Sequence, residues 1–164
     1  MRKVQLEKLT LNVGCGGDLE KIERAKKMLE MLTGQKPVVT LSKKRSTFGV
    51  AKGKPVGVKV TLRKKKAEEL LKKILAAKDN KVKLSQFDPE GNFSVGVGEY
   101  IELPGVKYSP EIGILGFDAT ATFKRAGYRI KYRKRAKRKI PNKHRIKREE
   151  VVEWLRQNFG VGVE

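Results

Sequence analysis

The sequence has almost none of the residues that build disulfides and Cys/His metal sites. Its 164 residues include one cysteine, Cys15, and one histidine, His144. A single cysteine excludes a disulfide within the chain, and one Cys with one His cannot supply the ligands of a structural zinc site. No motif orients the two side chains as a catalytic pair. We therefore expect no metal and no other cofactor, and we expect Cys15 to be a small buried side chain.

Long apolar runs and acidic side chains are also scarce. No apolar run approaches the roughly 18 to 20 residues of a membrane-spanning helix, and the N-terminal MRKVQLEKL lacks the apolar core of a signal peptide. These absences predict a cytoplasmic protein without a membrane partner. Only 18 Asp and Glu oppose 39 Lys and Arg, which gives a formal net charge of +21. So large an excess favours a polyanionic partner, and a nucleic acid is the first candidate.

The cations gather in two segments that contain no carboxylate. Residues 42–66 hold ten Lys or Arg, and residues 124–148 hold fourteen. Solvated charge runs usually mix both signs, so two segments of one sign indicate anion binding. In the first segment, the run from Lys43 to Ser46 forms a compact phosphate-binding set, because Arg donates in a planar fork, Lys is a point charge and Ser adds a hydroxyl. Few aromatic residues flank either segment, which favours phosphate, sugar and shape contacts with folded RNA over base stacking.

Hydrophobic spacing predicts an α+β fold with an antiparallel-rich sheet, helices packed on one face and basic RNA-binding loops. Alternation of apolar residues predicts strands over 4–13, with a bend near 7–8, and over 37–41, 56–62, 93–97 and 117–123. Apolar steps of three and four residues predict helices over 19–33, 64–77 and 149–159, with Asp18 as an N-cap and Gly34 and Gly160 as stops. We expect a loop after 78–81, a single domain over 1–164, and a basic extension at 124–148 that orders only on RNA.

A glycine-rich turn raises an enzymatic alternative. VGCGGD (13–18) lies between an expected strand and an expected helix and is similar to the first glycine motif of S-adenosylmethionine-dependent methyltransferases. However, Asn12 stands where those enzymes favour an acid, and the second strand ends without a carboxylate for ribose hydroxyls. A plain strand-to-helix turn is therefore favoured. An RNA methyltransferase of this type and a free RNA chaperone are the alternatives to a non-enzymatic RNA-binding protein.

Five ordered motifs resemble a single family. They are LTLNVGCGG (9–17), TGQKPVVT (33–40), KKRST (43–47), GKPVGVKVTLR (53–63) and DPEGNFSVGVGEYIELPGVKYSP (88–110). Together they resemble the 5S-RNA-binding ribosomal proteins that are number five in the large-subunit series. The resemblance implies an architectural, non-enzymatic protein of the central protuberance that attaches 5S rRNA to the large rRNA near the P-site tRNA.

Other implied partners are neighbouring ribosomal proteins of the central protuberance and the head of the small subunit. The segment 128–150, without an N-terminal helical extension, is similar to the archaeal and eukaryotic branch of the family. The absence of further extensions favours an archaeal source.

The resemblance also implies which residues touch RNA. It assigns 5S rRNA contacts to Asn12, Gln35 and Thr61, and we expect these three to converge on one surface beside the first basic segment. We expect 124–148 to be a second attachment, to neighbouring RNA. The family's loop towards tRNA corresponds to 77–86, where the cations are Lys78, Lys81 and Lys83. The expected rRNA-binding residues are Asn12, Gln35, Lys43, Lys44, Arg45, Ser46, Lys52, Lys54, Thr61, Arg63, Arg133, Lys134, Arg135, Lys137, Arg138, Lys143, His144 and Arg145.

Overall fold

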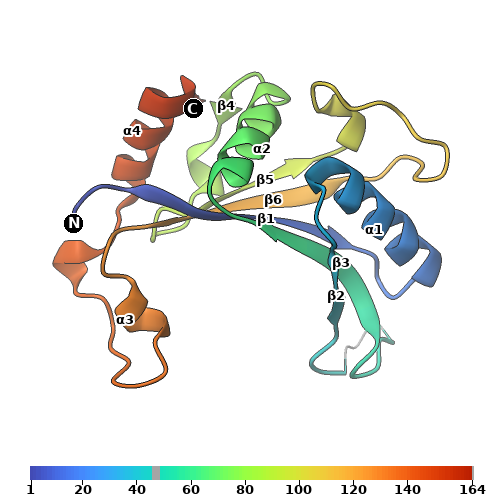
Figure 1. Cartoon of the computed structure of the whole chain (residues 1–164), viewed down its shortest axis with the longest axis horizontal. Coiled ribbons are helices and arrows are strands. Elements are labelled where there is room, and N and C mark those ends of the chain that lie inside the picture. The colour runs from blue at the N-terminus through green and yellow to red at the C-terminus, as the bar shows by residue number, and fades with distance from the viewer. Residues whose placement is uncertain (46–48, 164) are drawn as a thin grey trace. The chain divides into compact units, whose positions relative to one another are not determined.

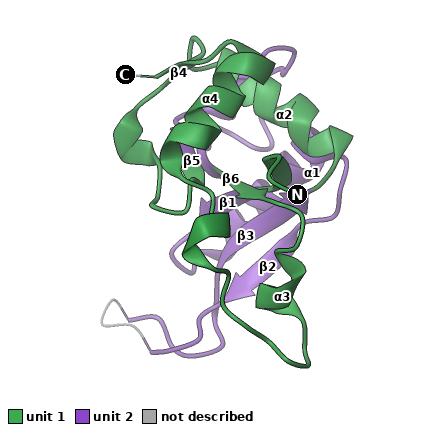
Figure 2. Ribbon diagram, turned by 90° about the vertical axis from the view of Figure 1, so that its left-hand side faces the viewer, with its two compact units in different colours: residues 1–9, 63–94, 120–164 green, residues 10–62, 95–119 purple. Residues whose placement is uncertain are grey.

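The computed structural model describes residues 1–45 and 49–163. The chain divides into two compact units, which Figure 2 shows in green and purple. Unit 1 comprises residues 1–9, 63–94 and 120–164, and unit 2 comprises residues 10–62 and 95–119. Expected site residues fall in both units. The expectation of a single domain stays a prediction.

The main sheet has five strands in the order β2-β3-β1-β6-β5. Their bounds are β1 (Gln5–Gly14), β2 (Val38–Leu41), β3 (Pro55–Leu62), β5 (Phe93–Val97) and β6 (Phe117–Lys124). β2 and β3 form an antiparallel pair in which Val38 lies opposite Lys59 and Val39 opposite Val58. The α+β prediction with an antiparallel sheet is confirmed, because every expected strand is present in the five-stranded sheet and, among the described residues, four α-helices accompany it.

In unit 2, helix α1 (Leu19–Thr33) packs on β3 (Figure 1). Asp18 caps its first turn by accepting hydrogen bonds from the backbone N–H groups of Glu20 and Lys21, and Gly34 ends it in the left-handed conformation. The helix buries Ile22, Ala25, Met28 and Leu29. A short 3-10 helix, η2 (Tyr100–Glu102), follows β5. The predicted cap and stop of α1 are both confirmed.

In unit 1, α2 (Lys65–Ala76) and α4 (Arg148–Phe159) supply most of the helical core. The side chains of Phe93, Phe123 and Trp154 follow one another in ring contact, with centroids 6.1 and 5.2 Å apart. Where a loop was expected after α2, the chain forms β4 (Lys81–Val82), which pairs in parallel with β7 (Gly162–Val163), and the 3-10 helix η1 (Leu84–Gln86). The expected loop therefore contains two short elements, which the sequence could not show because two-residue strands and single helical turns have no hydrophobic period to detect.

The C-terminal basic segment also contains regular structure. It forms α3 (Arg129–Tyr132) and the 3-10 helix η3 (Asn142–His144), and both belong to unit 1. The expectation that its order depends on RNA stays a prediction.

Candidate nucleic-acid interface

Unit 2 leaves one face of β1 and β3 uncovered. Leu11 and Val13 of β1 are buried, as are Val58, Val60 and Leu62 of β3. The residues between them, Asn12, Lys59 and Thr61, are exposed. Because side chains alternate across a strand and β1 neighbours β3, these three residues share the face opposite α1. The structure therefore brings Asn12 and Thr61 onto one polar surface.

The two strands approach each other closely at Gly57. A Cβ atom at this position would lie 2.4 Å from the backbone oxygen of Val13 and 3.3 Å from Oγ1 of Thr40. Only glycine permits this spacing without a backbone shift. Gly57 was not among the expected site residues, although the alternation of Gly57 with valines was visible in the sequence.

The loop between β2 and β3 carries the first group of cations. Its base is closed by hydrogen bonds from Ser42 N to Lys54 O (2.8 Å) and from Gly53 N to Ser42 O (2.9 Å). Lys43, Lys44, Arg45, Lys52 and Lys54 are exposed, and their side chains have no acceptor among the described residues. Ser46 lies outside the described residues. These five cations are free to bind an external anion.

Gln35 and Arg63 are placed differently from the residues on the polar face. Gln35 is half-buried in the turn between α1 and β2, where its backbone N–H donates to Oγ1 of Thr33 at 3.3 Å. Arg63, at the end of β3, is exposed, and its guanidinium lies 3.9 Å from the carboxylate of Glu7. Glu7 was not expected at a basic surface, and it offsets part of the charge of Arg63. The convergence of Gln35 with Asn12 and Thr61 stays a prediction.

In unit 1, the second basic segment is anchored from inside by Tyr128 and Arg125. The Tyr128 hydroxyl accepts from the backbone N–H of Ile146 at 2.9 Å and donates to the carbonyl of His144 at 3.3 Å. Burial raises the pKa of Tyr128 above its ordinary value. Arg125, whose side chain is 6% exposed, forms a 2.5 Å hydrogen-bonded ion pair with Glu150 and donates to the carbonyls of His144 and Arg145. Neither anchor was among the expected site residues.

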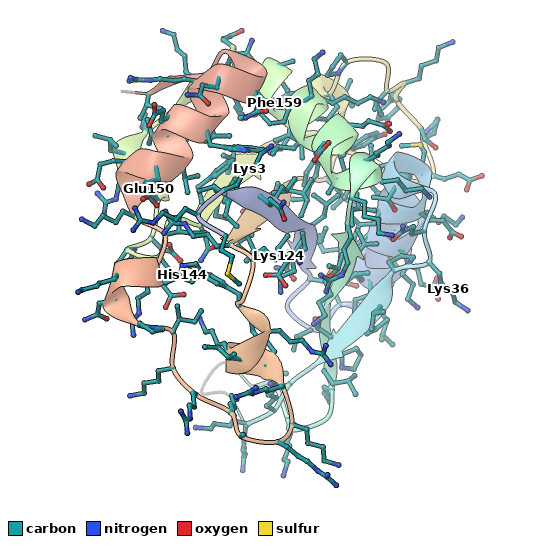
Figure 3. The ribbon with its side chains drawn as sticks, turned by 60° about the vertical axis from the view of Figure 1, so that its left-hand side comes forward. Lys3, Lys36, Lys124, His144, Glu150 and Phe159 are labelled. Atoms are coloured by element: carbon teal, nitrogen blue, oxygen red, sulfur yellow. The ribbon has the colours of Figure 1, made fainter. Side chains whose placement is uncertain are left out.

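His144 and Arg145 serve this inner network as well. His144 Nε2 lies 2.9 Å from the carbonyl of Ala126, and the ring meets that of Tyr128 edge-on. Arg145 donates through Nε to the carbonyl of Ile140 at 3.2 Å, and Ile140 is buried. Figure 3 shows His144 and Glu150 in this part of unit 1. Both expected RNA contacts therefore also hold the protein segment in place.

The other cations of the segment that were expected to bind RNA are exposed. Arg133 Nε donates to the carbonyl of Ala136, which has a φ of +49°, and so fixes the turn that presents them. Lys134, Arg135, Lys137, Arg138 and Lys143 are exposed, and no described residue accepts a hydrogen bond from their side chains. These are all expected RNA-binding residues.

The three expected tRNA-proximal lysines lie in unit 1 around β4. Lys78 is half-buried, whereas Lys81 and Lys83 are exposed. The backbone here is tied to the C-terminal strand, because Asn80 O accepts from Gly162 N at 2.8 Å. The segment 77–86 is therefore a turn, a short strand and a 3-10 helix, and a hydrogen bond joins it to the C-terminal strand.

The glycine-rich turn has a structural role. Gly16 and Gly17 have φ values of +61° and +98°, which favour glycine, and Cys15 N donates to Val56 O at 2.9 Å to join the turn to β3. Cys15 is buried, which raises the pKa of its thiol. Across the described ranges, no group of three or more His, Cys, Asp or Glu side chains could hold a metal ion. Among the described helices, none is long and apolar enough to cross a membrane.

Comparisons with known proteins match almost the whole chain. A family model described as "Ribosomal protein L5" matches residues 1–50, and a second model, which describes the C-terminus of the same ribosomal family, matches residues 55–154. The large ribosomal subunit protein uL5 of Sulfurisphaera tokodaii is 50% identical, over 99% of this chain and 93% of its own length. Proteins of the same name from Methanosphaera stadtmanae and Nanoarchaeum equitans are each 45% identical, over 100% and 99% of this chain and 98% and 97% of their own lengths.

Proposed function

The chain belongs to the ribosomal protein L5 family, and we infer from this membership that it is a structural constituent of the large ribosomal subunit, of the archaeal type. It acts in the cytoplasmic ribosome by binding and positioning RNA and makes or breaks no covalent bond. The methyltransferase and the free-chaperone alternatives find no support, since the glycine turn is accounted for by backbone conformation and both family models are ribosomal.

We propose that unit 2 binds 5S rRNA through its polar sheet face and the neighbouring cationic loop. One observation carries this proposal: Lys43, Lys44, Arg45, Lys52 and Lys54 are exposed without protein acceptors among the described residues, in the same unit as the uncovered Asn12 and Thr61. The cations hold phosphates, while the amide and the hydroxyl contact sugar or base edges. Gln35 adds a second amide from the turn after α1.

The second basic segment, in unit 1, attaches to the large-subunit rRNA. Its outward cations have no protein acceptors among the described residues, while Tyr128 and Arg125 hold the backbone beneath them. Attachment at both segments fixes one RNA relative to the other in the central protuberance, where neighbouring ribosomal proteins complete the contacts. Lys78, Lys81 and Lys83 face the P-site tRNA in this proposal, and the head of the small subunit is a further partner.

The proposal is tested by 5S rRNA binding of the Lys43→Ala, Lys44→Ala, Arg45→Ala triple variant, measured by fluorescence anisotropy between 50 and 300 mM KCl. Each lost phosphate contact lowers the slope of log K against log salt by roughly 0.7 to 0.9. We therefore expect weaker binding and a slope reduced by about two to three units.

The matched control is the Lys21→Ala, Lys72→Ala, Lys73→Ala triple variant, which removes the same charge from exposed positions on α1 and α2. Alanine favours helix, so these replacements preserve the fold. We expect the control slope to equal that of the wild type. Equal losses of 5S rRNA affinity and of salt slope in both triple variants would mean that RNA is attracted by the overall charge. This result would refute a binding site at the loop.

A further inference from the structure

Unit 1 contains a pocket whose lining combines expected RNA-binding cations with aromatic residues that were not expected to contact RNA. Its volume is about 520 Å³, and it lies between α3, the loop that follows α3, β6 and the turn before β5. The loop is closed by a hydrogen bond from Arg138 N to Ile130 O at 3.2 Å, and Ile140 and Ile146 are buried behind it. Figure 2 shows α3 and this loop projecting from the green unit. Ligand pockets in proteins commonly have this size.

The rim of the pocket is cationic. Lys137, Arg138 and Lys139 line it, and their side chains have no acceptor in the part of the chain that the structure describes. Among the described residues of the lining, Glu90 alone carries a carboxylate. It is paired with Lys131 at 3.0 Å, and this hydrogen bond raises the pKa of Lys131. Lys131 thus neutralises the carboxylate of Glu90, so the cationic rim attracts a ligand that carries negative charge.

The walls of the pocket are aromatic. Tyr132 lines it and is 59% exposed, although tyrosine has a large apolar ring that favours burial. Phe123 and Tyr128 also line it, and the hydroxyl of Tyr128 is already used inside the protein. Thr122 adds a half-buried hydroxyl that makes no hydrogen bond to a described residue. A flat ring with polar edges fits such walls, because it stacks on tyrosine and receives a hydrogen bond at its edge.

We propose that this pocket receives one unstacked nucleotide of single-stranded or bulged RNA. The base enters the pocket and stacks on Tyr132, and its edge meets Thr122. The flanking phosphates lie on Lys137, Arg138 and Lys139. A paired duplex keeps its bases stacked inside and cannot fill a pocket of this kind, so the ligand is an unpaired residue. This inference rests on the proposed role of the second basic segment in binding rRNA. It adds base stacking at one position, although the scarcity of aromatic residues predicts that stacking is a minor contribution overall.

The test measures binding of the full chain to a hexauridylate RNA and to a blunt RNA duplex of equal phosphate number, in 150 mM KCl. Stacking of a base on an aromatic side chain corresponds to about a 5- to 150-fold change in affinity on alanine substitution. We expect Tyr132→Ala to weaken hexauridylate binding by that factor and to leave the duplex affinity unchanged. Tyr132→Phe keeps the ring and should bind like the wild type. Tyr132 is exposed, so circular dichroism of both variants should match that of the wild type.

Three outcomes would overturn the proposal that the pocket receives a nucleotide. They are an unchanged hexauridylate affinity in Tyr132→Ala, an equal loss of duplex affinity in Tyr132→Ala, or a loss of hexauridylate affinity of the same size in Tyr132→Phe. The 5S rRNA affinity of the same Tyr132→Ala protein separates the two proposals. If it stays normal while hexauridylate binding is also normal, the pocket fails and the proposed function stands. If the wild type fails to bind 5S rRNA, the proposed function fails whatever the hexauridylate result.

Discussion

The hydroxyl of Tyr128 ties two parts of the second basic segment together through two hydrogen bonds. Tyr128→Phe removes both of its hydrogen bonds and leaves the backbone N–H of Ile146, a buried residue, without its acceptor. An unpaired buried donor costs about 1 to 3 kcal/mol. We predict a loss of that size in the free energy of unfolding, measured with urea at pH 8. Tyr132→Phe is the control and should be neutral, because the ring of Tyr132 is exposed and its hydroxyl makes no hydrogen bond to a described residue.

The loss of stability caused by Tyr128→Phe depends on pH, and burial of Tyr128 determines the direction of that dependence. Because burial raises the folded pKa of Tyr128 above the unfolded value of about 10, the stabilisation by this group is complete below pH 10. It is lost as the pH rises through the folded pKa. The difference in stability between wild type and Tyr128→Phe should therefore shrink between pH 8 and pH 11. A stability difference that stays constant from pH 8 to pH 11 would contradict a raised pKa of Tyr128 in the folded protein.

Single residues were predictable from the sequence where the cause is local. The side chain of Asp18 caps a helix that begins at the next residue, and Gly34 ends that helix in a conformation that suits glycine. Arg125, His144 and Arg145 were not distinguishable from the other cations. Their acceptors, which include the carboxylate of Glu150, lie five to 25 residues away along the chain.

At the scale of elements, the pairing of β3 with β1 depends on the close approach at Gly57. Gly57→Ala would place a methyl group 2.4 Å from a backbone oxygen of the neighbouring strand, which cannot move as a side chain does. Overpacking of this kind typically costs about 1 to 3 kcal/mol. We predict that loss in urea unfolding, together with weaker 5S rRNA binding, because Asn12 and Thr61 lie on the strands that would separate.

Gly96→Ala is the matched control for Gly57→Ala. Gly96 also lies inside a strand of the sheet, but its added methyl group would lie 3.5 Å from the carboxylate of Asp118, which is ordinary contact. We expect little change in stability or RNA affinity. Equal stability of Gly57→Ala and Gly96→Ala would show that the two strands have room at Gly57.

Elements with a clear hydrophobic period were predictable, and short ones were not. The alternation of Phe117, Ala119, Ala121 and Phe123 gave β6 directly, and all four side chains are buried. β4 and β7 have two residues each and form only because Lys81 meets Gly162 across the chain. The sequence also could not show the pocket beside α3, since its walls come from four separate segments.

At the scale of the whole molecule, the excess of positive charge predicted the class of partner before any element was known. The charge of +21 and the two carboxylate-free segments identified a polyanion, and the ordered motifs identified the family. Composition did not show which cations are available. In the structure Arg125 is engaged inside unit 1, while Lys43, Lys44 and Lys137 have no acceptor among the described residues.

This charge predicts opposite effects of salt on the free protein and on its RNA complex. Repulsion among the cations destabilises the free chain, and raising KCl from 50 to 300 mM shortens the Debye length from roughly 14 to 6 Å and screens that repulsion. The exposed ion pairs Arg24–Glu20, Lys27–Glu111 and Lys131–Glu90 are weakened by the same salt, but each contributes little. We expect screening to raise the free energy of unfolding of the free protein by about 1 to 2 kcal/mol, which corresponds to a rise in melting temperature of roughly 2 to 8 °C.

Over the same range of salt the affinity for 5S rRNA should fall, because the release of counterions from neutralised phosphates is less favourable in concentrated salt. A variant with Lys134, Lys137 and Lys139 replaced by Gln carries three fewer positive charges on one exposed loop, so its melting temperature should rise less with KCl. A melting temperature that falls with KCl in the wild type would mean that the ion pairs outweigh the repulsion. The two cationic segments would then not strain the free fold, and RNA would not be needed to relieve them.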